Sequence, residues 1–198
     1  MKSLLDYPIV YLTLQSVIGA KKARRICIQQ YSKPQTGERV LDVGCGPGFV
    51  IEYMPQVEYV GIDIDRRYID YANKRYGNRG KFHCVELNRD NAEQFRNFDL
   101  ILLNGVLHHI DDDGVIALLK LLRDSLREKG RVMTLDGSYY DSMSPWSRFF
   151  LRNDRGQFVR TEPEYLSLAS QVFPHVAHER RNDLFSIPYD ALVMVCTQ

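Results

Sequence analysis

The sequence from Val40 to Gly48 reads Val-Leu-Asp-Val-Gly-Cys-Gly-Pro-Gly, a short apolar run that ends in a glycine-rich turn. Such a run predicts a buried strand, and residues 49–54 predict a helix directly after the turn. Glycine lets a ligand approach the backbone closely, and the free N–H groups at a helix start favour a negatively charged group. This stretch therefore predicts a strand, a turn and a helix that together bind a ligand.

Two residues decide which ligand suits this turn. A dinucleotide-binding turn has the pattern G-x-G-x-x-G, which here requires glycine or alanine at position 49, and the chain has Phe49. Asp42 would repel a pyrophosphate, whereas a carboxylate suits a ligand with an ammonium group. S-adenosylmethionine carries an ammonium group, a carboxylate and a sulfonium and has no phosphate. We therefore expect S-adenosylmethionine as the cofactor, with S-adenosylhomocysteine as its product, rather than NAD or FAD.

A second acidic residue follows the next predicted strand. The run Tyr59-Val60-Gly61-Ile62 is followed by Asp63, whose carboxylate can accept hydrogen bonds from both hydroxyls of a ribose. Asp65 is better explained as the N-cap of the following helix. Alternatively, Asp42 and Asp63 only cap or solvate strand ends.

Strand and helix patterns alternate around these motifs. The predicted strands are 40–43, 59–62, 82–85, 100–103 and 131–135. The predicted helices are 49–54, 66–76 and 115–128, the last stopped by Gly130, with a short turn near 91–95. This alternation predicts an α/β fold with a mostly parallel sheet, helices on both faces, and ligands at the carboxyl ends of the strands.

The remaining segments complete a single domain, 1–198. Residues 7–31 have the apolar period of an amphipathic helix, and residues 137–160 show neither period and are expected to form an insertion over the ligand end of the sheet. Thr161 and Glu164 form a capping box for a helix to about residue 173, and the runs 176–181 and 191–196 could pair as an antiparallel hairpin. We divide the domain into an N-terminal helical cap (1–35), a cofactor-binding half (36–136), the insertion (137–160) and a C-terminal helix and hairpin (161–198).

The set of motifs resembles that of the class I S-adenosylmethionine-dependent methyltransferases, and it is most similar to the small-molecule branch that includes the ubiquinone and menaquinone methyltransferases. The motifs are Leu41 to Gly48, Gly61 to Asp65, and Asn97 to Ile101 together with Val106 to Ile110. The resemblance covers residues 36–136. It implies a Rossmann-like, seven-stranded sheet of order 3-2-1-4-5-7-6 with strand 7 antiparallel, which agrees with the expected hairpin.

The resemblance also implies which residues bind the cofactor. The methionine part would lie near Asn104 and the turn, the ribose on Asp63, and the adenine against Ile64, Glu86 and Leu87. The turn residues implied are Asp42, Gly44, Cys45, Gly46 and Gly48. Glu86 departs from the family pattern, which often has an aspartate followed by a small residue at this place.

The chemistry of methyl transfer needs few special side chains. It is an in-line displacement with a neutral leaving group, so alignment of the acceptor and exclusion of water can supply much of the catalysis. If a general base is used, the candidates are His108 and His109, which follow the fourth strand; their alternative role is to order the loop. Asp111 to Asp113 are expected to cap a helix, and we expect no metal.

Aromatic and basic residues of the insertion are further candidates. Tyr139, Tyr140 and Trp146, with Tyr11 of the leading helix, could wall an acceptor pocket or could pack in the core. The insertion also carries a basic patch that is usually a solvated face but is compatible with an anionic acceptor or a phospholipid surface. Its residues are Arg148, Arg152, Arg155 and Arg160.

Composition limits the remaining classes of function. The 198 residues carry 26 basic and 25 acidic side chains, so no strongly basic face for nucleic acid is indicated. The four cysteines form no CxxC pair, and no apolar run is long enough to span a bilayer, so we expect a cytoplasmic protein. The expected function is methyl transfer to a small molecule. The alternatives are a module that binds S-adenosylmethionine without turnover and a protein methyltransferase, and the sequence does not indicate the oligomeric state.

Overall fold

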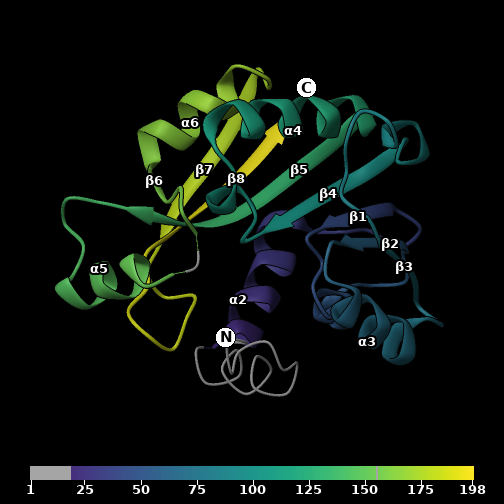
Figure 1. Cartoon of the computed structure of the whole chain (residues 1–198), viewed down its shortest axis with the longest axis horizontal. Helices are drawn as coiled ribbons and strands as arrows, with labels where there is room; N and C mark the ends of the chain where they lie inside the picture. Colours follow the sequence, from purple (N-terminus) through teal and green to yellow (C-terminus); the bar gives the residue numbers. More distant parts are fainter. Residues whose placement is uncertain (1–18, 155) are drawn as a thin grey trace.

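The computed structural model describes residues 19–154 and 156–198, so the predictions for residues 7–18, Tyr11 among them, and for Arg155 lie outside the described residues. One mixed sheet of eight strands crosses this part of the chain in the order β3-β2-β1-β4-β5-β8-β7, with β6 paired to β5 (Figure 1). The strands are β1 (Arg39–Val43), β2 (Glu58–Asp63), β3 (Gly80–Cys84), β4 (Phe98–Asn104), β5 (Leu126–Tyr139), β6 (Arg160–Thr161), β7 (His175–Arg181) and β8 (Ala191–Thr197).

The topology expected from the sequence is confirmed. Strands β1 to β5 pair in parallel, whereas β8 is antiparallel to both β5 and β7 and forms the closing hairpin. The two-residue β6 was not expected, and it only shifts the numbers of the last two strands by one. Because β1, β2 and β4 are parallel neighbours, their carboxyl ends meet at one edge, where the candidate site lies.

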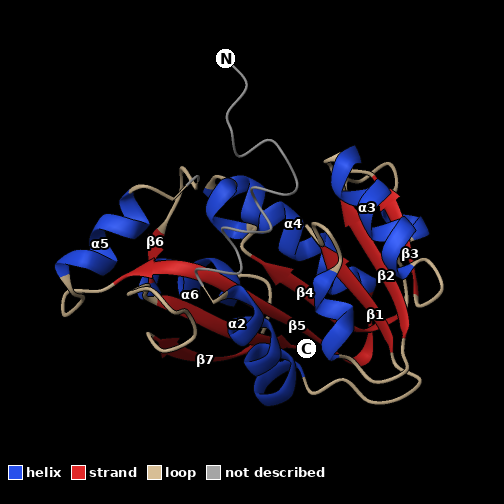
Figure 2. Ribbon diagram, turned by 90° about the horizontal axis from the view of Figure 1, so that it is seen from below, coloured by secondary structure: helices blue, strands red, loops and turns tan. Residues whose placement is uncertain are grey.

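Helices cover both faces of the sheet (Figures 1 and 2). One face packs against α4 (Asp112–Ser125) and α6 (Glu162–Ser170), and the other against α2 (Ala20–Ile26), α3 (Arg66–Tyr76) and two irregular turns, the π-helical η2 (Cys27–Ser32) and the 3-10 helix η3 (Phe49–Tyr53). Alternate side chains of a strand point to opposite faces, so Leu41 joins the first apolar cluster while Val40 joins the second. The short 3-10 turns η4 (Ala92–Gln94) and η5 (Leu107–His109) and the helix α5 (Pro145–Arg152) complete the fold.

Several helix ends follow the predicted capping chemistry. Helix α3 begins after Asp65, whose side chain accepts the Arg67 N–H at 2.9 Å. The Thr161 N–H donates to Glu164 at 2.7 Å at the start of α6, which confirms the capping box. Each cap satisfies a helix N–H that has no partner within the helix.

Two predictions about helices were wrong. Helix α4 spans 112–125 rather than 115–128, because Asp111 caps it by accepting the Gly114 N–H at 2.9 Å and because it ends where Leu126 takes up extended backbone. Residues up to Gly130 therefore belong to β5 and not to the helix. The insertion was expected to lack regular structure, but it contains α5, which Ser144 caps by accepting the Ser147 N–H at 3.0 Å. An eight-residue helix is too short for its period to be recognised in the sequence.

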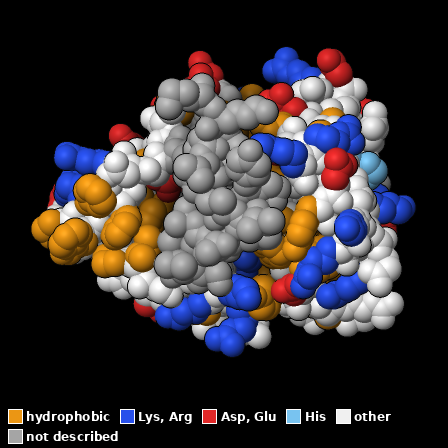
Figure 3. Space-filling model, turned by 60° about the horizontal axis from the view of Figure 1, so that its bottom comes forward, with side chains coloured by type: hydrophobic (Ala, Val, Ile, Leu, Met, Phe, Trp, Pro, Cys, Tyr) orange, Lys and Arg blue, Asp and Glu red, His pale blue; other side chains and the backbone are white. Residues whose placement is uncertain are grey.

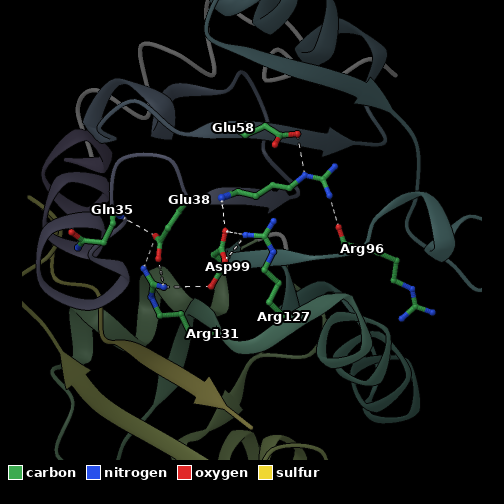
Figure 4. Close-up of polar contacts among 8 residues, drawn as sticks. Gln35, Glu38, Glu58, Arg96, Asp99, Arg127 and Arg131 are labelled. Atoms are coloured by element: carbon green, nitrogen blue, oxygen red, sulfur yellow. Dashed lines mark hydrogen bonds and ion pairs between the residues drawn. The ribbon is translucent and has the colours of Figure 1, made fainter.

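An ion-pair network holds the amino ends of the strands together, opposite the candidate site (Figure 4). Arg131 of β5 contacts both carboxylate oxygens of Glu38, at 2.9 and 3.0 Å. Asp99 of β4 accepts the Arg39 N–H at 2.7 Å and is paired with the Arg127 guanidinium at 2.7 Å. Partial burial would raise the pKa of Asp99, but these hydrogen bonds and charges lower it overall. The network therefore ties three neighbouring strands together.

Within residues 19–154 and 156–198, no helix has both the length and the apolar character needed to cross a membrane.

Candidate functional site

The glycine turn between β1 and η3 is anchored to the neighbouring strand by its backbone. The N–H groups of Gly44 and Cys45 both donate to the carbonyl of Ile62 in β2, at 2.9 and 3.0 Å. Gly44, Gly46 and Gly48 all have positive φ, at 72°, 53° and 76°. Residues other than glycine rarely adopt this conformation, so the turn needs its glycines.

The three glycines differ in what surrounds them. A Cβ atom on Gly48 would lie 2.8 Å from the ring of Phe82, and one on Gly44 would lie 2.6 Å from the side chain of Val106. A Cβ atom on Gly46 would meet no atom of residues 19–154 or 156–198 within 4 Å. Gly48 and Gly44 are therefore required by packing, while Gly46 presents bare backbone to open space.

Asp63 holds this turn and the start of α3 together. Its Oδ2 accepts the Gly46 N–H and its Oδ1 accepts the Asp65 N–H, both at 2.8 Å. A carboxylate oxygen can accept more than one hydrogen bond, so both oxygens keep capacity for ligand hydroxyls. Asp63 is thus fixed by the backbone and remains half-buried at the edge of the sheet.

A cavity of about 690 Å³ opens where the turn and Asp63 meet. Seven of the ten residues expected to bind the cofactor line it: Gly44, Gly46, Asp63, Ile64, Glu86, Leu87 and Asn104. Ile64 is 75% exposed, which leaves an apolar surface beside Asp63 for a flat ligand group. The volume lies in the range typical of small-molecule sites. The open backbone, the apolar platform and the anchored carboxylate fit the expected nucleoside ligand.

The other three expected residues lie outside the cavity wall. Cys45 and Gly48 are packed beneath the turn, and Asp42 is 1% exposed. The Tyr59 hydroxyl donates to Asp42 Oδ2 at 2.5 Å, and Asp42 Oδ1 has no hydrogen-bond partner among the described residues. Burial raises the pKa of Asp42 to about 7; the Tyr59 hydrogen bond opposes this shift, and the nearby charge of Asp63 adds to it. Asp42 therefore acts from beneath the turn, where its charge depends on pH.

Other residues of the wall were missed by the sequence analysis. Tyr68 of α3 and Asn88 and Arg89 after β3 line the cavity, as do Ala117, Leu118 and Leu121 of α4. Leu118 and Leu121 are three residues apart, so they share one face of the helix, and from sequence that spacing is indistinguishable from a core-facing stripe. Their place in the wall follows only from the position of α4 over the sheet.

The two histidines after β4 occupy different environments. His109 is exposed and lines the cavity, whereas His108 is buried beside it, with the two ring centroids 4.3 Å apart. His108 Nδ1 lies 2.8 Å from Asp136 Oδ1, and His108 Nε2 lies 3.8 Å from Asp154 Oδ1. Burial would lower the pKa of His108, but the hydrogen bond and charge of Asp136, with the charge of Asp154, raise it overall. His108 therefore stands between two carboxylates, one from β5 and one from the insertion.

The insertion closes over the His108 ring. The Phe158 N–H donates to the His108 carbonyl at 2.9 Å, and a Cβ atom on Gly156 would lie 2.1 Å from His108 Cδ2. Asp154, in turn, accepts a hydrogen bond from the Tyr189 hydroxyl. These contacts screen His108 from the cavity and leave His109 on its wall.

Three of the four aromatic residues expected in an acceptor pocket belong to the described residues, and these three, Tyr139, Tyr140 and Trp146, do not line this cavity. The Tyr140 ring lies 4.0 Å from the guanidinium of Arg180, and Tyr139 is half-buried at the end of β5. Trp146 is 68% exposed on α5. The acid cluster after the histidines is likewise structural, because Asp111 caps α4 and Asp112 pairs with Arg160 at 2.7 Å.

Comparisons with known proteins agree with this geometry. A family profile described as a methyltransferase domain matches residues 41–132. The malonyl-[acyl-carrier protein] O-methyltransferase of Legionella pneumophila is 30% identical over 129 residues, which are 63% of this chain and 41% of that protein. A tRNA U34 carboxymethyltransferase of Alteromonas mediterranea is 27% identical over 107 residues, 49% of this chain and 32% of that protein. The chain thus spans less than half the length of either relative.

Solved structures extend the similarity to the whole fold. The pyocyanin biosynthetic protein PhzM has a TM-score of 0.74 and 19% identity to this chain, over 95% of this chain and 57% of PhzM. At this level of identity, the likeness shows that the two chains share a fold.

Proposed function

Because the chain belongs to the class I S-adenosylmethionine-dependent methyltransferases, we propose that it transfers a methyl group from S-adenosylmethionine to a small-molecule acceptor. The observation that carries this proposal is Asp63, fixed by two backbone N–H groups beside the open backbone of Gly46 in a cavity of about 690 Å³. The cofactor would supply an electrophilic methyl group on a sulfonium centre.

The residues of the wall divide the cavity by chemistry. Asp63 would accept hydrogen bonds from the ribose hydroxyls. Ile64 and Leu87 would pack against the adenine, and Glu86 would face the polar edge of the adenine. The turn at Gly44 and Gly46, with Asn104 opposite, would hold the methionine part. Asp42 lies beneath the turn, behind the residues that line the cavity. From there its negative charge would attract the ammonium group of the methionine part.

We assign the two histidines different tasks. His109 lies on the cavity wall, so it is the candidate to accept a proton from the acceptor. His108 is a positioning residue: it joins the carboxyl ends of β4 and β5 to the insertion through Asp136 and Asp154. Both histidines were candidates from the sequence, and we prefer His109 because Gly156 and Asp154 cover the His108 ring.

The acceptor class is proposed from size and charge. The names of the relatives span a carrier-bound malonyl acceptor and a tRNA. The formal charge of +1 supplies little of the phosphate-driven affinity that a tRNA substrate requires, and we therefore favour a small molecule. We also propose a cytoplasmic location, which is supported by four cysteines that are all free thiols.

Cofactor binding tests the first half of the proposal. Calorimetry with S-adenosylmethionine should show a Kd that rises at least about tenfold in Asp63→Ala, because two charge-assisted hydrogen bonds are lost. Asp70→Ala, an exposed aspartate on α3, is the matched control and should leave the Kd unchanged. Binding of nicotinamide dinucleotides in place of S-adenosylmethionine would contradict the proposal.

Transfer is tested separately. The protein is incubated with S-adenosylmethionine and with either the small-molecule or the protein fraction of a cell extract, and S-adenosylhomocysteine is measured. Formation with the small-molecule fraction supports the proposal, whereas formation only with the protein fraction identifies a protein methyltransferase. Cofactor binding without product in either fraction would identify a binding module. Once an acceptor is known, His109→Ala should lower kcat without changing the cofactor Kd.

A further inference from the structure

Helix α5 turns its aromatic side chains away from the protein. The side chains of Ser147 and Leu151, four residues apart, are buried against the body of the molecule. On the outward face Trp146 is 68% exposed and Phe149 is 55% exposed. An exposed Trp and Phe side by side on one helix are unfavourable in water, so this face is suited to a partner that removes them from it.

Basic residues border the aromatic pair. Arg148 and Arg152 lie on the same helix; Arg152 is exposed, and Arg148 is half-buried with its Nη2 3.5 Å from the Tyr140 carbonyl oxygen. Figure 3 shows hydrophobic side chains gathered at the end of the molecule that α5 forms, with Lys and Arg side chains next to them. The nearest acids in sequence are Asp141, which is exposed, and Asp154, which is engaged by Tyr189 and His108. The outward face of α5 is therefore apolar with a basic border.

The position of α5 leaves this face accessible beside the site. The helix stands beyond the sheet at the end opposite β3 (Figure 2). It is followed by the loop whose residues Asp154 and Gly156 cover His108. A surface that holds α5 would therefore lie next to the carboxyl edge of the sheet.

We propose that α5 docks the protein on an anionic phospholipid surface, with Trp146 and Phe149 inserted at the level of the headgroups and Arg148 and Arg152 against the lipid phosphates. An apolar helix face with a basic border suits a helix that lies in the plane of a membrane interface. Trp in particular favours the boundary between headgroups and hydrocarbon. The arginines decide the choice of partner, because an apolar face alone does not distinguish a lipid surface from a second copy of the chain. This inference needs no methyl transfer, so it stands or falls separately from the proposed function.

The chain offers a direct probe, since Trp146 is its single tryptophan. The full chain is titrated with vesicles of phosphatidylcholine alone and with vesicles that contain about one third phosphatidylglycerol, while Trp146 emission is recorded. Docking predicts a blue shift with the anionic vesicles and quenching by lipids brominated near the headgroup. The shift should weaken as salt is raised, because the attraction to anionic lipid is screened.

Variants separate charge from apolar contact. In Arg148→Gln/Arg152→Gln the apparent affinity for anionic vesicles should fall roughly tenfold or more, and in Phe149→Ser roughly tenfold. The matched control is Arg66→Gln/Lys74→Gln, which removes two exposed charges from α3 at the other end of the molecule and should bind as the unchanged protein does. Circular dichroism of each variant confirms that it is folded.

Four outcomes would overturn the proposal. They are no shift with either kind of vesicle, an equal shift with both kinds, a shift caused by soluble polyglutamate as large as that caused by anionic vesicles, and a shift that grows with protein concentration without lipid. The third would identify an acidic macromolecule as the partner, and the fourth, checked by sedimentation, would identify a second copy of the chain.

Discussion

Replacement of Asp42 by asparagine should change how the stability of the protein depends on pH. Burial raises the pKa of this carboxyl from 3.8 to about 7. The folded state therefore holds a proton on Asp42 at pH values where the unfolded state has released it, and stability must fall as pH rises from about 4 to 7. Between pH 5 and pH 8, this pKa difference amounts to about 2 to 3 kcal/mol of stability lost from this one group. An asparagine side chain cannot ionise, so the variant should lack this loss.

The measurement is urea unfolding of both proteins at pH 5 and at pH 8, without ligand. The difference in unfolding free energy, variant minus unchanged protein, should be larger at pH 8 than at pH 5 by about 2 to 3 kcal/mol. Asp70→Asn, at an exposed position on α3, controls for the loss of a charge. If the difference for Asp42→Asn is the same at both pH values, Asp42 does not have a raised pKa in the folded state, and its pH-dependent role beneath the turn must be abandoned.

Further predictions concern three other features. Gly48→Ala should destabilise the protein by at least about 1 kcal/mol, since φ is 76° and the new Cβ would lie 2.8 Å from Phe82. Gly46→Ala should lower the unfolding free energy less but weaken cofactor binding; urea unfolding measures the first effect and calorimetry the second. Arg131→Met should lower the unfolding free energy by about 1 to 3 kcal/mol, because it removes the cation paired with the half-buried Glu38 carboxylate and leaves that carboxylate only the Gln35 N–H among the contacts described. Thermal unfolding that matches the unchanged protein would refute this. The pKa of His108 is raised in the folded protein, so its contribution to stability is present below its ordinary pKa and is lost as pH rises through the raised pKa. His108→Gln should therefore lower the unfolding free energy more at pH 5.5 than at pH 8.5. An equal loss at both pH values would show that the two carboxylates do not stabilise a charged His108.

The parallel half of the sheet could be predicted because its sequence signals are local. Most strands there contain an apolar run, and Asp65 marks the start of α3 with its own side chain, as Thr161 does for α6 in the C-terminal part. The end of α4 could not be found in this way, because Gly130 looked like a helix stop while the chain already extends from Leu126. The register of β4 with β5, a tertiary contact, accounts for that difference: Leu126 pairs with Phe98.

The candidate site shows the same division. Gly46 and Asp63 could be selected from the sequence because each closely follows a predicted strand. In the structure the Gly46 N–H donates to Asp63 Oδ2 at 2.8 Å. The different environments of His108 and His109 could not be predicted, because the two residues are adjacent in sequence. The residues that surround His108, namely Asp136, Asp154 and Gly156, come from distant parts of the chain. The sequence showed the aromatic and basic residues of α5 but did not predict the helix. Their common outward face could therefore be recognised only in the structure.

The two backbone hydrogen bonds to Asp63 also bear on the speed and thermodynamics of ligand capture. Both oxygens are oriented by the N–H groups of Gly46 and Asp65, so a nucleoside would meet a rigid acceptor and would not have to immobilise a rotating side chain on arrival. The loss of side-chain freedom accompanies folding instead. Encounter should then depend mainly on diffusion into the cavity, and affinity differences among nucleosides should be expressed chiefly in how fast each one leaves.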